Sequence, residues 1–364
     1  MSPKNDSGGK SIEPKNLLIV RTDRIGDVVL SLPLAGIVKK HYPQCKITFL
    51  LRNYTKSLVE NHPYIDEVII LHESNQKISL FSNIMVTAAK KFDSCVIVYP
   101  TFIAALIIFL SGIKNRIGTG YRLYSFLFNR KVYEHRKHAE KHELEYNINL
   151  LQYFGIYEKT DYASINFDIK TNDQSLHKVN NLLIAHEIKT GVPLIIVHPG
   201  SGGSSINFPP EKFKELIGLV DSNLNTQILV TGSENEKDMC GRLIINEKIK
   251  NFAGLLDLSE LIALISRCSI FISNSTGPIH IAAALGKYTI GFYPNLLACS
   301  AKRWGPYTEK KAIFTPDKTC SDCRREQCSS EDCMKTIKAT DVFVQIEKIY
   351  KFITNIGELN VQNI

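Results

Sequence analysis

A short loop near the start of the chain carries four charged side chains. It reads Arg21-Thr-Asp-Arg-Ile-Gly-Asp27 and follows the apolar run Asn16–Val20, which is typical of a buried parallel strand. Ligands bind beyond the carboxyl ends of such strands, so this unusually charged loop is a candidate ligand site. A solvated loop in which Asp27 only caps the next helix is the alternative interpretation.

A second stretch with the chemistry of a ligand site is Ser273–Gly286. The apolar run Cys268–Ile272 predicts a strand, and an Ala-rich helix is expected to begin at Pro278, whose missing N–H suits a first helical position. Ser275 or Thr276 is expected to cap this helix through its hydroxyl. A strand, a turn of small residues and a helix N-terminus together predict a phosphate site. An ordinary strand–helix junction is the alternative.

The segments that position these two stretches alternate between strand and helix patterns. This alternation predicts an α/β protein with parallel sheets in two successive halves, joined by the polar, irregular segment Asp161–Asp173. The first loop has only Gly26 where a dinucleotide-binding fingerprint needs three glycines, which disfavours a dinucleotide dehydrogenase. The other predicted strands are Lys46–Leu51, Val68–Leu71 and Ser94–Tyr99 in the first half, and Pro193–His198 and Gln227–Thr231 in the second.

Length and composition set broad limits on the protein class. The chain has 364 residues, enough for about two domains, with 44% hydrophobic and 22% charged residues, as in soluble globular proteins. The net charge of +8 favours an anionic partner without choosing among nucleotide, nucleic acid and lipid. Met1–Lys15 has no apolar core of the signal-peptide type, so we expect a mobile arm on a cytoplasmic protein.

One uncharged run, Val96–Ile113, approaches the length of a membrane span. Pro100 divides it, so we expect a buried strand at Cys95–Tyr99 followed by a strongly apolar helix at Phe102–Leu110. This interpretation leaves open a contact between one face of that helix and a membrane surface.

Four stretches, taken in order, resemble one family. They are Val20–Pro33, His198–Gly202, Thr231–Glu234 and Ser275–Gly286, and as an ordered set they are similar to glycosyltransferase family 9, the ADP-heptose:lipopolysaccharide heptosyltransferases. The resemblance covers nearly the whole chain from Asn16 onward. It implies a GT-B architecture, with two facing Rossmann-like domains and an interdomain cleft. The implied divisions are an arm (1–15), an acceptor domain (16–172), a nucleotide-sugar domain (173–340) and a C-terminal helix (341–364) that returns to the first domain.

The resemblance also implies roles for individual residues. Asp27 matches the family's general base, which takes the proton from the acceptor hydroxyl while a single displacement inverts the anomeric carbon. For Glu234, charge compensation at a helix N-terminus is the alternative to contact with the ribose, and for His280 packing is the alternative to contact with the donor phosphates. The predicted donor-binding residues are Ser201, Glu234, Ser275, Thr276, Gly277, Pro278 and His280, and the predicted acceptor-binding residues are Arg24, Arg116 and Arg122.

Two positions depart from the family pattern. Ile206 stands where members often carry a lysine that neutralises the donor phosphates, so another cation (Arg21, Arg24 or Lys302) must substitute or activity is weakened. Ser275 stands where some members have Asp, a milder change. We predict catalysis without a metal or cofactor, and the absence of a D-x-D carboxylate pair from the sequence agrees with it.

Four of the nine cysteines are concentrated near the C-terminus. Four thiolates in a short loop suit a tetrahedral Zn²⁺ site, with disulfides or free thiols as the alternatives. The distance of the cluster from the other motifs favours a fold-stabilising role. The four residues are Cys320, Cys323, Cys328 and Cys333.

These observations predict an inverting transferase that moves a heptose or related sugar from a nucleotide-diphosphate donor, such as ADP-heptose, to a lipopolysaccharide core acceptor. The expected partners are the donor, the core and lipid A acceptor, and the inner-membrane surface as a peripheral contact, with no nucleic acid. One alternative is a non-catalytic nucleotide- or glycan-binding family member, which Ile206 supports. The other is a different GT-B nucleotide-sugar enzyme, such as an epimerase.

Overall fold

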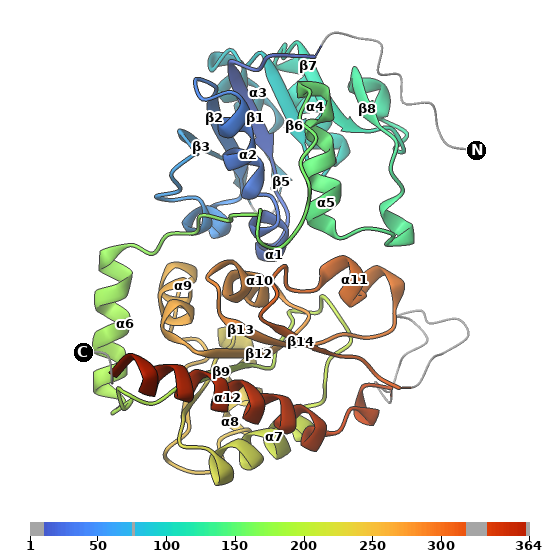
Figure 1. Cartoon of the computed structure of the whole chain (residues 1–364). Helices are drawn as coiled ribbons and strands as arrows, with labels where there is room; N and C mark the ends of the chain where they lie inside the picture. The colour runs from blue at the N-terminus through green and yellow to red at the C-terminus, as the bar shows by residue number, and fades with distance from the viewer. Residues whose placement is uncertain (1–10, 75–76, 318–332, 362–364) are drawn as a thin grey trace. The chain divides into compact units, whose positions relative to one another are not determined.

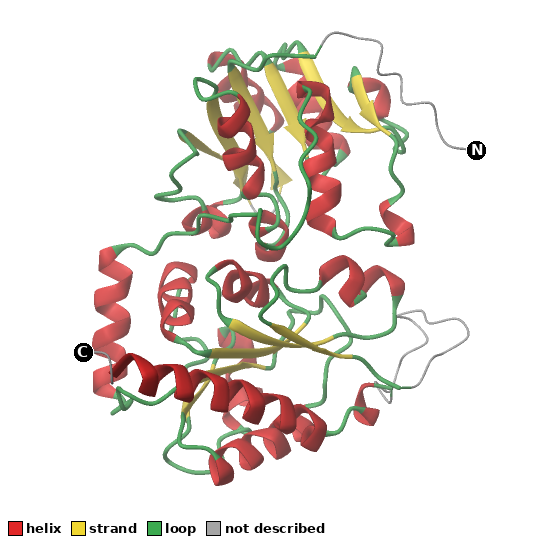
Figure 2. Ribbon diagram, in the orientation of Figure 1, coloured by secondary structure: helices red, strands yellow, loops and turns green. Residues whose placement is uncertain are grey.

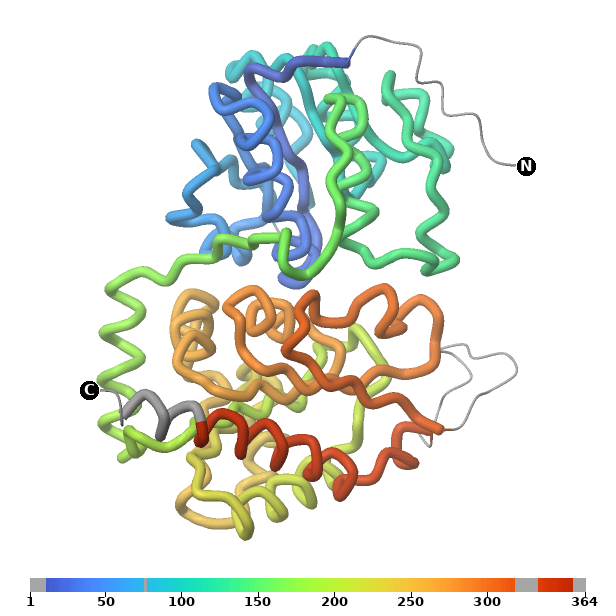
Figure 3. The backbone as a smooth tube through the Cα atoms, viewed as in Figure 1, coloured from blue at the N-terminus to red at the C-terminus, as the bar shows by residue number. Residues whose placement is uncertain are grey.

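The computed structural model describes residues 11–74, 77–317 and 333–361, with side chains described up to residue 355. The chain divides into two compact units, Met1–Lys170 and Thr171–Ile364. Each unit is a sheet with helices on both faces (Figures 1 and 2). All strands of the first sheet precede those of the second along the chain, as the trace in Figure 3 shows.

The first unit is built on a six-stranded parallel sheet in the order β3-β2-β1-β6-β7-β8. Strand β1 is apolar along its whole length after Asn16 because both faces of the sheet are covered. A separate antiparallel pair is formed by β4 (Glu73–Ser74) and β5 (Lys77–Ile78). The strands of the sheet are β1 (Asn16–Val20), β2 (Lys46–Leu51), β3 (Glu67–Ile70), β6 (Ser94–Ile97), β7 (Asn115–Thr119) and β8 (Arg130–Val132).

In the described part of this unit, five α-helices accompany the sheet. Side chains alternate along β1, so Leu18 and Val20 share one core with Ala105 and Ile108 of α4. Thr101 caps α4, since its Oγ1 accepts a hydrogen bond from the N–H of Ala104 at 3.1 Å. The helices are α1 (Ile25–Val29), α2 (Pro33–His41), α3 (Leu80–Ala89), α4 (Phe102–Leu110) and α5 (Glu143–Ile148), with shorter 3₁₀ turns at Asn53–Leu58 and Ser125–Leu127.

The second unit repeats the arrangement with a six-stranded parallel sheet in the order β11-β10-β9-β12-β13-β14. Its strands are β9 (Leu194–His198), β10 (Gln227–Val230), β11 (Lys250–Asn251), β12 (Ile270–Asn274), β13 (Tyr288–Phe292) and β14 (Lys311–Phe314). Its helices are α6 (Asp173–Ala185), α7 (Pro210–Asn223), α8 (Lys237–Gly241), α9 (Leu258–Arg267), α10 (Gly277–Ala284), α11 (Ala301–Trp304) and α12 (Ala339–Val361).

The predicted fold class is confirmed, because each half forms its own parallel sheet of the Rossmann type. The apolar run Val96–Ile113 divides as expected at Pro100, with β6 ending at Ile97 and α4 beginning at Phe102. In the described part of the chain, no helix combines the length and the apolar character needed to cross a membrane.

The last helix belongs to the second unit over its described side chains. Helix α12 packs against α7, and Val342 and Ile346 are buried in the core of this unit. The structure therefore gives residues 341–355 a place in the second unit. The expected return of the chain end to the first domain stays a prediction, as do the limits of the arm and the acceptor and nucleotide-sugar domains.

Candidate active site

Each sheet has one point at which the strand order reverses direction. In the first unit, β2 lies on one side of β1 and β6 on the other; in the second, β10 and β12 flank β9. The loops that follow two such neighbouring strands leave in opposite directions and open a crevice, which is where α/β sheets bind ligands. The loop at Asp27 follows β1, and the turn at Ser275 follows β12, so both predicted sites lie at these points.

Arg21 is the centre of the first site. Its side chain is 1% exposed and forms ion pairs with Asp23 (Nε–Oδ1, 2.7 Å), with Asp27 (Nη2–Oδ1) and with Glu143 (Nη1–Oε1, 3.7 Å). Burial by itself lowers the pKa of this guanidinium, but the three carboxylates outweigh burial and raise the pKa above its usual range. Arg21 is therefore a permanent buried cation that holds carboxylates in place.

The two aspartates of the loop lie in different surroundings. Burial raises the pKa of Asp23; Arg21 opposes that shift and the nearby Asp27 carboxylate adds to it, so the pKa of Asp23 reaches about 7. Asp27 lies in the first turn of α1, and its side chain is 16% exposed. A carboxylate that is oriented by a fixed cation and still reaches solvent can accept a proton from a bound hydroxyl.

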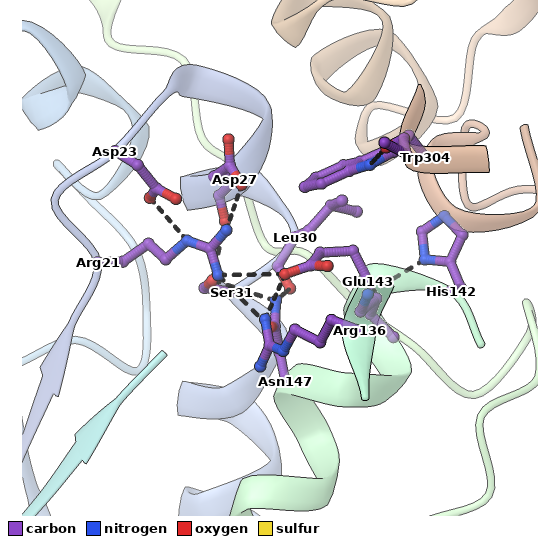
Figure 4. A network of polar contacts seen from close by, with 12 residues as sticks. Arg21, Asp23, Asp27, Leu30, Ser31, Arg136, His142, Glu143, Asn147 and Trp304 are labelled. Carbon is purple, nitrogen blue, oxygen red and sulfur yellow. Dashed lines mark hydrogen bonds and ion pairs between the residues drawn. The ribbon is translucent and has the colours of Figure 1, made fainter. Parts of the chain in front are cut away.

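Three residues far along the chain complete this network (Figure 4). Arg136 forms an ion pair with Glu143, and Asn147 Oδ1 accepts from Arg136 Nη1 at 3.1 Å and from Arg21 Nη1 at 3.5 Å. Asn147 Nδ2 donates to the carbonyl of Leu30 at 2.9 Å, which ties α5 to the end of α1. Glu143 and Asn147 are four residues apart on α5 and so share one face of it.

Sequence reasoning missed these three residues. Asn147 is 126 residues from Arg21, and no local spacing relates the two. A buried Glu and a buried Asn, four apart at the start of a short helix, are the one signal that could have suggested a polar role. This signal can be recognised only when the burial of both residues is known, and burial comes from the structure.

The predicted acceptor-binding arginines do not form a single cluster. Arg24 is exposed at the N-cap of α1 beside Asp27, and Arg122 is exposed after β7. Arg116 pairs in register with Cys95, towards the amino end of the sheet, and donates to the carbonyls of Leu127 at 2.8 Å and Ile113 at 2.6 Å. These contacts give Arg116 a role in supporting the fold, and its acceptor contact stays a prediction that they do not favour.

In the second unit, Asn274 fixes the two loops of the predicted donor site together. Its Oδ1 accepts from the N–H of Phe208 at 2.7 Å, and its Nδ2 donates to the carbonyl of Pro199 at 2.6 Å. The Gly/Ser loop after β9 is thereby held against the end of β12. Ser201 lies in this loop with its Oγ buried, and that oxygen has no hydrogen-bond partner among the described residues.

The turn after β12 forms the helix start that the sequence predicts, with one difference. Thr276 is the N-cap of α10 and Pro278 lies in its first turn, but the Thr276 side chain makes no capping hydrogen bond. The prediction that a hydroxyl of Ser275 or Thr276 caps this helix is therefore wrong. With no hydroxyl bonded to them, the first N–H groups of α10 and the helix dipole remain to meet an anion. His280 is buried one turn further on, and its contact with the donor phosphates stays a prediction, with packing as the alternative.

Two glutamates follow β10. Glu234 is 68% exposed, and Gly254, at φ +78°, passes so close to it that a Cβ there would lie 1.9 Å from Glu234 Oε2. Glu236 instead accepts from the N–H and Oγ of Ser233, both at 2.8 Å, and so caps its own turn. Glu234 lies in the first turn after Ser233, with its Oε1 3.4 Å from Lys237 Nζ, so its contact with the ribose stays a prediction and charge compensation stays the alternative.

Ile206 is part of the hydrophobic core of the second unit and is 4% exposed, together with Phe208 and Phe213. The position at which a lysine was anticipated therefore faces inward. Arg21 is occupied by three carboxylates of the first unit, which leaves Arg24 and the exposed Lys302 on α11 as the remaining predicted substitutes. Cys299, three residues before Lys302, donates from Sγ to the Ser204 carbonyl at 3.6 Å, so this segment adjoins the Gly/Ser loop.

A family model described as glycosyltransferase family 9 (heptosyltransferase) matches residues 87–334, which is more than half of the chain. The chain belongs to glycosyltransferase family 9. The resemblance drawn from the four ordered motifs is thus confirmed. The motif at Asp27 lies outside the matched residues, whereas Ser201, Glu234 and the turn at Ser275 lie within them.

Known members of this family align with this chain over most of their length. Lipopolysaccharide heptosyltransferase 3 of Escherichia coli is 22% identical over 335 residues, which cover 89% of this chain and 96% of that one. The crystal structure of a glycosyl transferase family 9 protein from Veillonella parvula superposes with a TM-score of 0.80 at 18% identity, covering 94% and 99%. The E. coli heptosyltransferase WaaC with ADP gives 0.70 at 18% identity, covering 92% and 99%. At these sequence identities, the structural similarity supports the fold alone.

The predicted zinc ligands Cys320, Cys323 and Cys328 lie outside the described residues. Cys333 is described, and it is buried in the core of the second unit next to Met334. Within the described ranges, no three His, Cys, Asp or Glu side chains gather closely enough to hold a metal ion.

Proposed function

We propose that this family 9 member is an inverting transferase that moves a heptose or related sugar from ADP-heptose to the core of a lipopolysaccharide acceptor. The observation that carries the proposal is the placement of Asp27: a carboxylate held by a buried arginine at the point where the first sheet reverses its strand order. The activity named for the relatives supports the sugar and the acceptor, and the ADP in the WaaC structure supports the nucleotide.

In the proposed reaction, Asp27 takes the proton from an acceptor hydroxyl as its oxygen attacks the anomeric carbon. The bond from that carbon to the diphosphate breaks, ADP leaves with the electron pair, and the configuration inverts. Ser201 Oγ and the start of α10 support a diphosphate contact, because a buried hydroxyl without a partner and a helix N-terminus both favour an oxyanion. Glu234 is proposed to accept from the ribose hydroxyls.

The departure at Ile206 supports a second candidate, a family member that binds a nucleotide or glycan without turnover. A buried isoleucine cannot neutralise a leaving diphosphate. If the protein is an enzyme, Lys302 and the dipole of α10 must carry more of that stabilisation. We propose that catalysis needs no metal, that the acceptor is met at the cytoplasmic side of the inner membrane, and that Arg24 and Arg122 contact the acceptor.

The two candidates are separated by incubating the purified chain with ADP-heptose or UDP-sugars and a deacylated core oligosaccharide, and following nucleotide release. We expect ADP release that depends on the acceptor and is unchanged by a chelator. Nucleotide binding without release from any donor would favour the non-catalytic candidate. Activity that a chelator removes and Mg²⁺ restores would contradict the metal-independent mechanism.

A further inference from the structure

Exposed apolar side chains gather on one layer of the first unit. Among its described residues, every exposed Leu, Ile, Phe or Met belongs to α3, to α4 or to the turn around Ser125–Leu127. Helices α3 and α4 pack side by side, so their outer faces form one surface. On α4, Phe102 and Phe109 are seven residues apart, as are Ile103 and Leu110, which puts all four on one face.

Helix α4 is thus apolar all round. Its inner residues Ala105 and Ile108 are buried against the sheet, and the outer stripe has no covering element in the described chain. A surface helix of a water-soluble unit normally carries polar residues on its outer face, so an apolar outer face indicates a partner.

The segment after β7 continues this surface. The rings of Phe102 and Tyr124 meet edge to face, with centroids 5.8 Å apart, and the hydroxyl of Tyr124 donates to the carbonyl of Pro100 at 2.6 Å. These contacts hold Leu123 and Phe126 beside the start of α4, where Leu123 is fully exposed and Phe126 is 71% exposed. The outer faces of α3 and α4, with Leu123 and Phe126, are called the α3–α4 patch below.

The segment that forms this patch is strongly basic, although Lys90 at the end of α3 is ion-paired with Glu67 of β3. Between Ser74 and Tyr133 the sequence has eight Lys and Arg residues and a single acidic residue, Asp93, a net charge of +7 out of +8 for the whole chain. Asp93 lies at the amino end of the sheet, where it accepts from the N–H of Asn16 at 2.6 Å. At the end of α4, the guanidinium of Arg116 lies 5.2 Å from the centroid of the Phe109 ring. Apolar residues rimmed by cations suit an anionic bilayer surface.

We propose that the α3–α4 patch docks the protein on anionic phospholipid at a bilayer surface. The link to the acceptor rests on the proposed function: Tyr99 precedes α4, and its ring lies 5.9 Å from the guanidinium of Arg21, which holds Asp27. A lipid-anchored acceptor on the docked bilayer is thereby delivered to the sheet edge that carries the general base. Leu123 and Phe126 enter the interfacial region, and Lys and Arg side chains meet the lipid phosphates.

The test is co-sedimentation of the full chain with vesicles of phosphatidylethanolamine and phosphatidylglycerol, compared with phosphatidylcholine alone. We expect binding to the anionic vesicles only, weakened when salt is raised from about 0.1 M to about 0.5 M. The double variant Leu123→Ser/Phe126→Ser should reduce partitioning roughly tenfold or more. Both side chains are exposed, so their loss leaves the core intact.

The matched control is Ile184→Ser on α6 of the second unit, since Ile184 is 75% exposed and lies outside the patch. It should bind vesicles as the wild type does. Equal binding by the double variant and the wild type would overturn the proposal. So would a concentration-dependent dimer in ultracentrifugation that the double variant abolishes, because the patch would then join two copies of the chain.

Neither donor nor acceptor is present in this assay, so its outcome is independent of the transfer reaction. The double variant should keep its rate on a deacylated core oligosaccharide in solution and lose rate on the same core carried by vesicles. Vesicle binding without transfer would leave docking standing and remove the proposed function. Transfer without vesicle binding would support the proposed function and overturn the docking proposal.

Discussion

Glu143 Oε1 lies 3.7 Å from Arg21 Nη1, and both side chains are almost completely buried. Glu143 belongs to α5, whereas Arg21 follows β1, so the contact joins two parts of the first unit that are distant in sequence. Arg21 thereby faces three carboxylates, and Arg136 adds a second cation at the same oxygen of Glu143, Oε1. The orientation of Asp27 therefore depends on a buried network of charges and not on the loop alone.

Asp27→Asn should leave nucleotide binding intact and lower the rate of transfer by roughly 10²-fold or more, since an amide cannot accept the proton of the acceptor hydroxyl. Acceptor-dependent ADP release and calorimetric titration with ADP measure the two properties. Asp238→Asn, an exposed substitution on α8, is the control. A transfer rate near that of the wild type would remove Asp27 from the role of general base.

Glu143→Gln should lower the free energy of unfolding by about 3 kcal/mol, because it removes one partner of a buried charge network. With one carboxylate fewer around Arg21, the cation acts more strongly on the two aspartates, so the acid limb of the pH–rate profile should move to lower pH.

Urea denaturation and kcat/KM as a function of pH measure these effects, with the exposed Glu140→Gln as the control. A loss of stability with an unmoved acid limb would restrict Glu143 to a structural role.

The pKa of Asp23 is about 7 in the folded protein against an ordinary value of 3.8, so between these values the folded chain holds a proton that the unfolded chain releases. The contribution of Asp23 to the free energy of unfolding is therefore present at low pH and is lost as the pH rises through this window. Between about pH 5 and about pH 8, the free energy of unfolding of the wild type should fall by about 1–3 kcal/mol more than that of Asp23→Asn. Urea denaturation of both proteins at each pH checks this, and parallel curves would contradict the raised pKa.

Ser201→Ala should raise the KM for the donor several-fold while leaving the melting temperature unchanged, because Ser201 Oγ has no partner among the described residues to lose. Ser205→Ala is the matched control, since the Oγ of Ser205 is buried and donates to the carbonyl of Ile206 at 3.4 Å. Donor kinetics and thermal denaturation of both variants give the answer. If Ser201→Ala leaves donor binding as it was, the loop after β9 does not contact the diphosphate.

Ile206→Lys, which introduces the residue common in the family, should destabilise the protein by several kcal/mol and not raise its activity, because the side chain would enter the hydrophobic core. The exposed Ile184→Lys is the control and should be close to neutral. Urea denaturation and ADP release measure both properties. Higher turnover at unchanged stability would show that the loop can turn this position towards the donor.

The sequence by itself determined the fold class and the place of both candidate sites along the chain. Continuous apolar runs such as Asn16–Val20 require a covered parallel strand, and Pro100 alone was enough to separate β6 from α4. These are local signals, set by periodicity and by the backbone limits of proline. Asp27 and Ser275 were found because ligand loops follow strand ends, a rule that local sequence can apply.

Tertiary structure decided the contacts between residues that are distant in sequence, which no local spacing predicts. The packing of α5 beside α1 placed Glu143 and Asn147 around Arg21, and burial made that arginine a fixed support in place of a candidate donor cation. Burial also made Ile206 part of the hydrophobic core of the second unit. Charge and hydrogen-bonding roles depend on which groups lose water together, and that is settled only when distant segments pack.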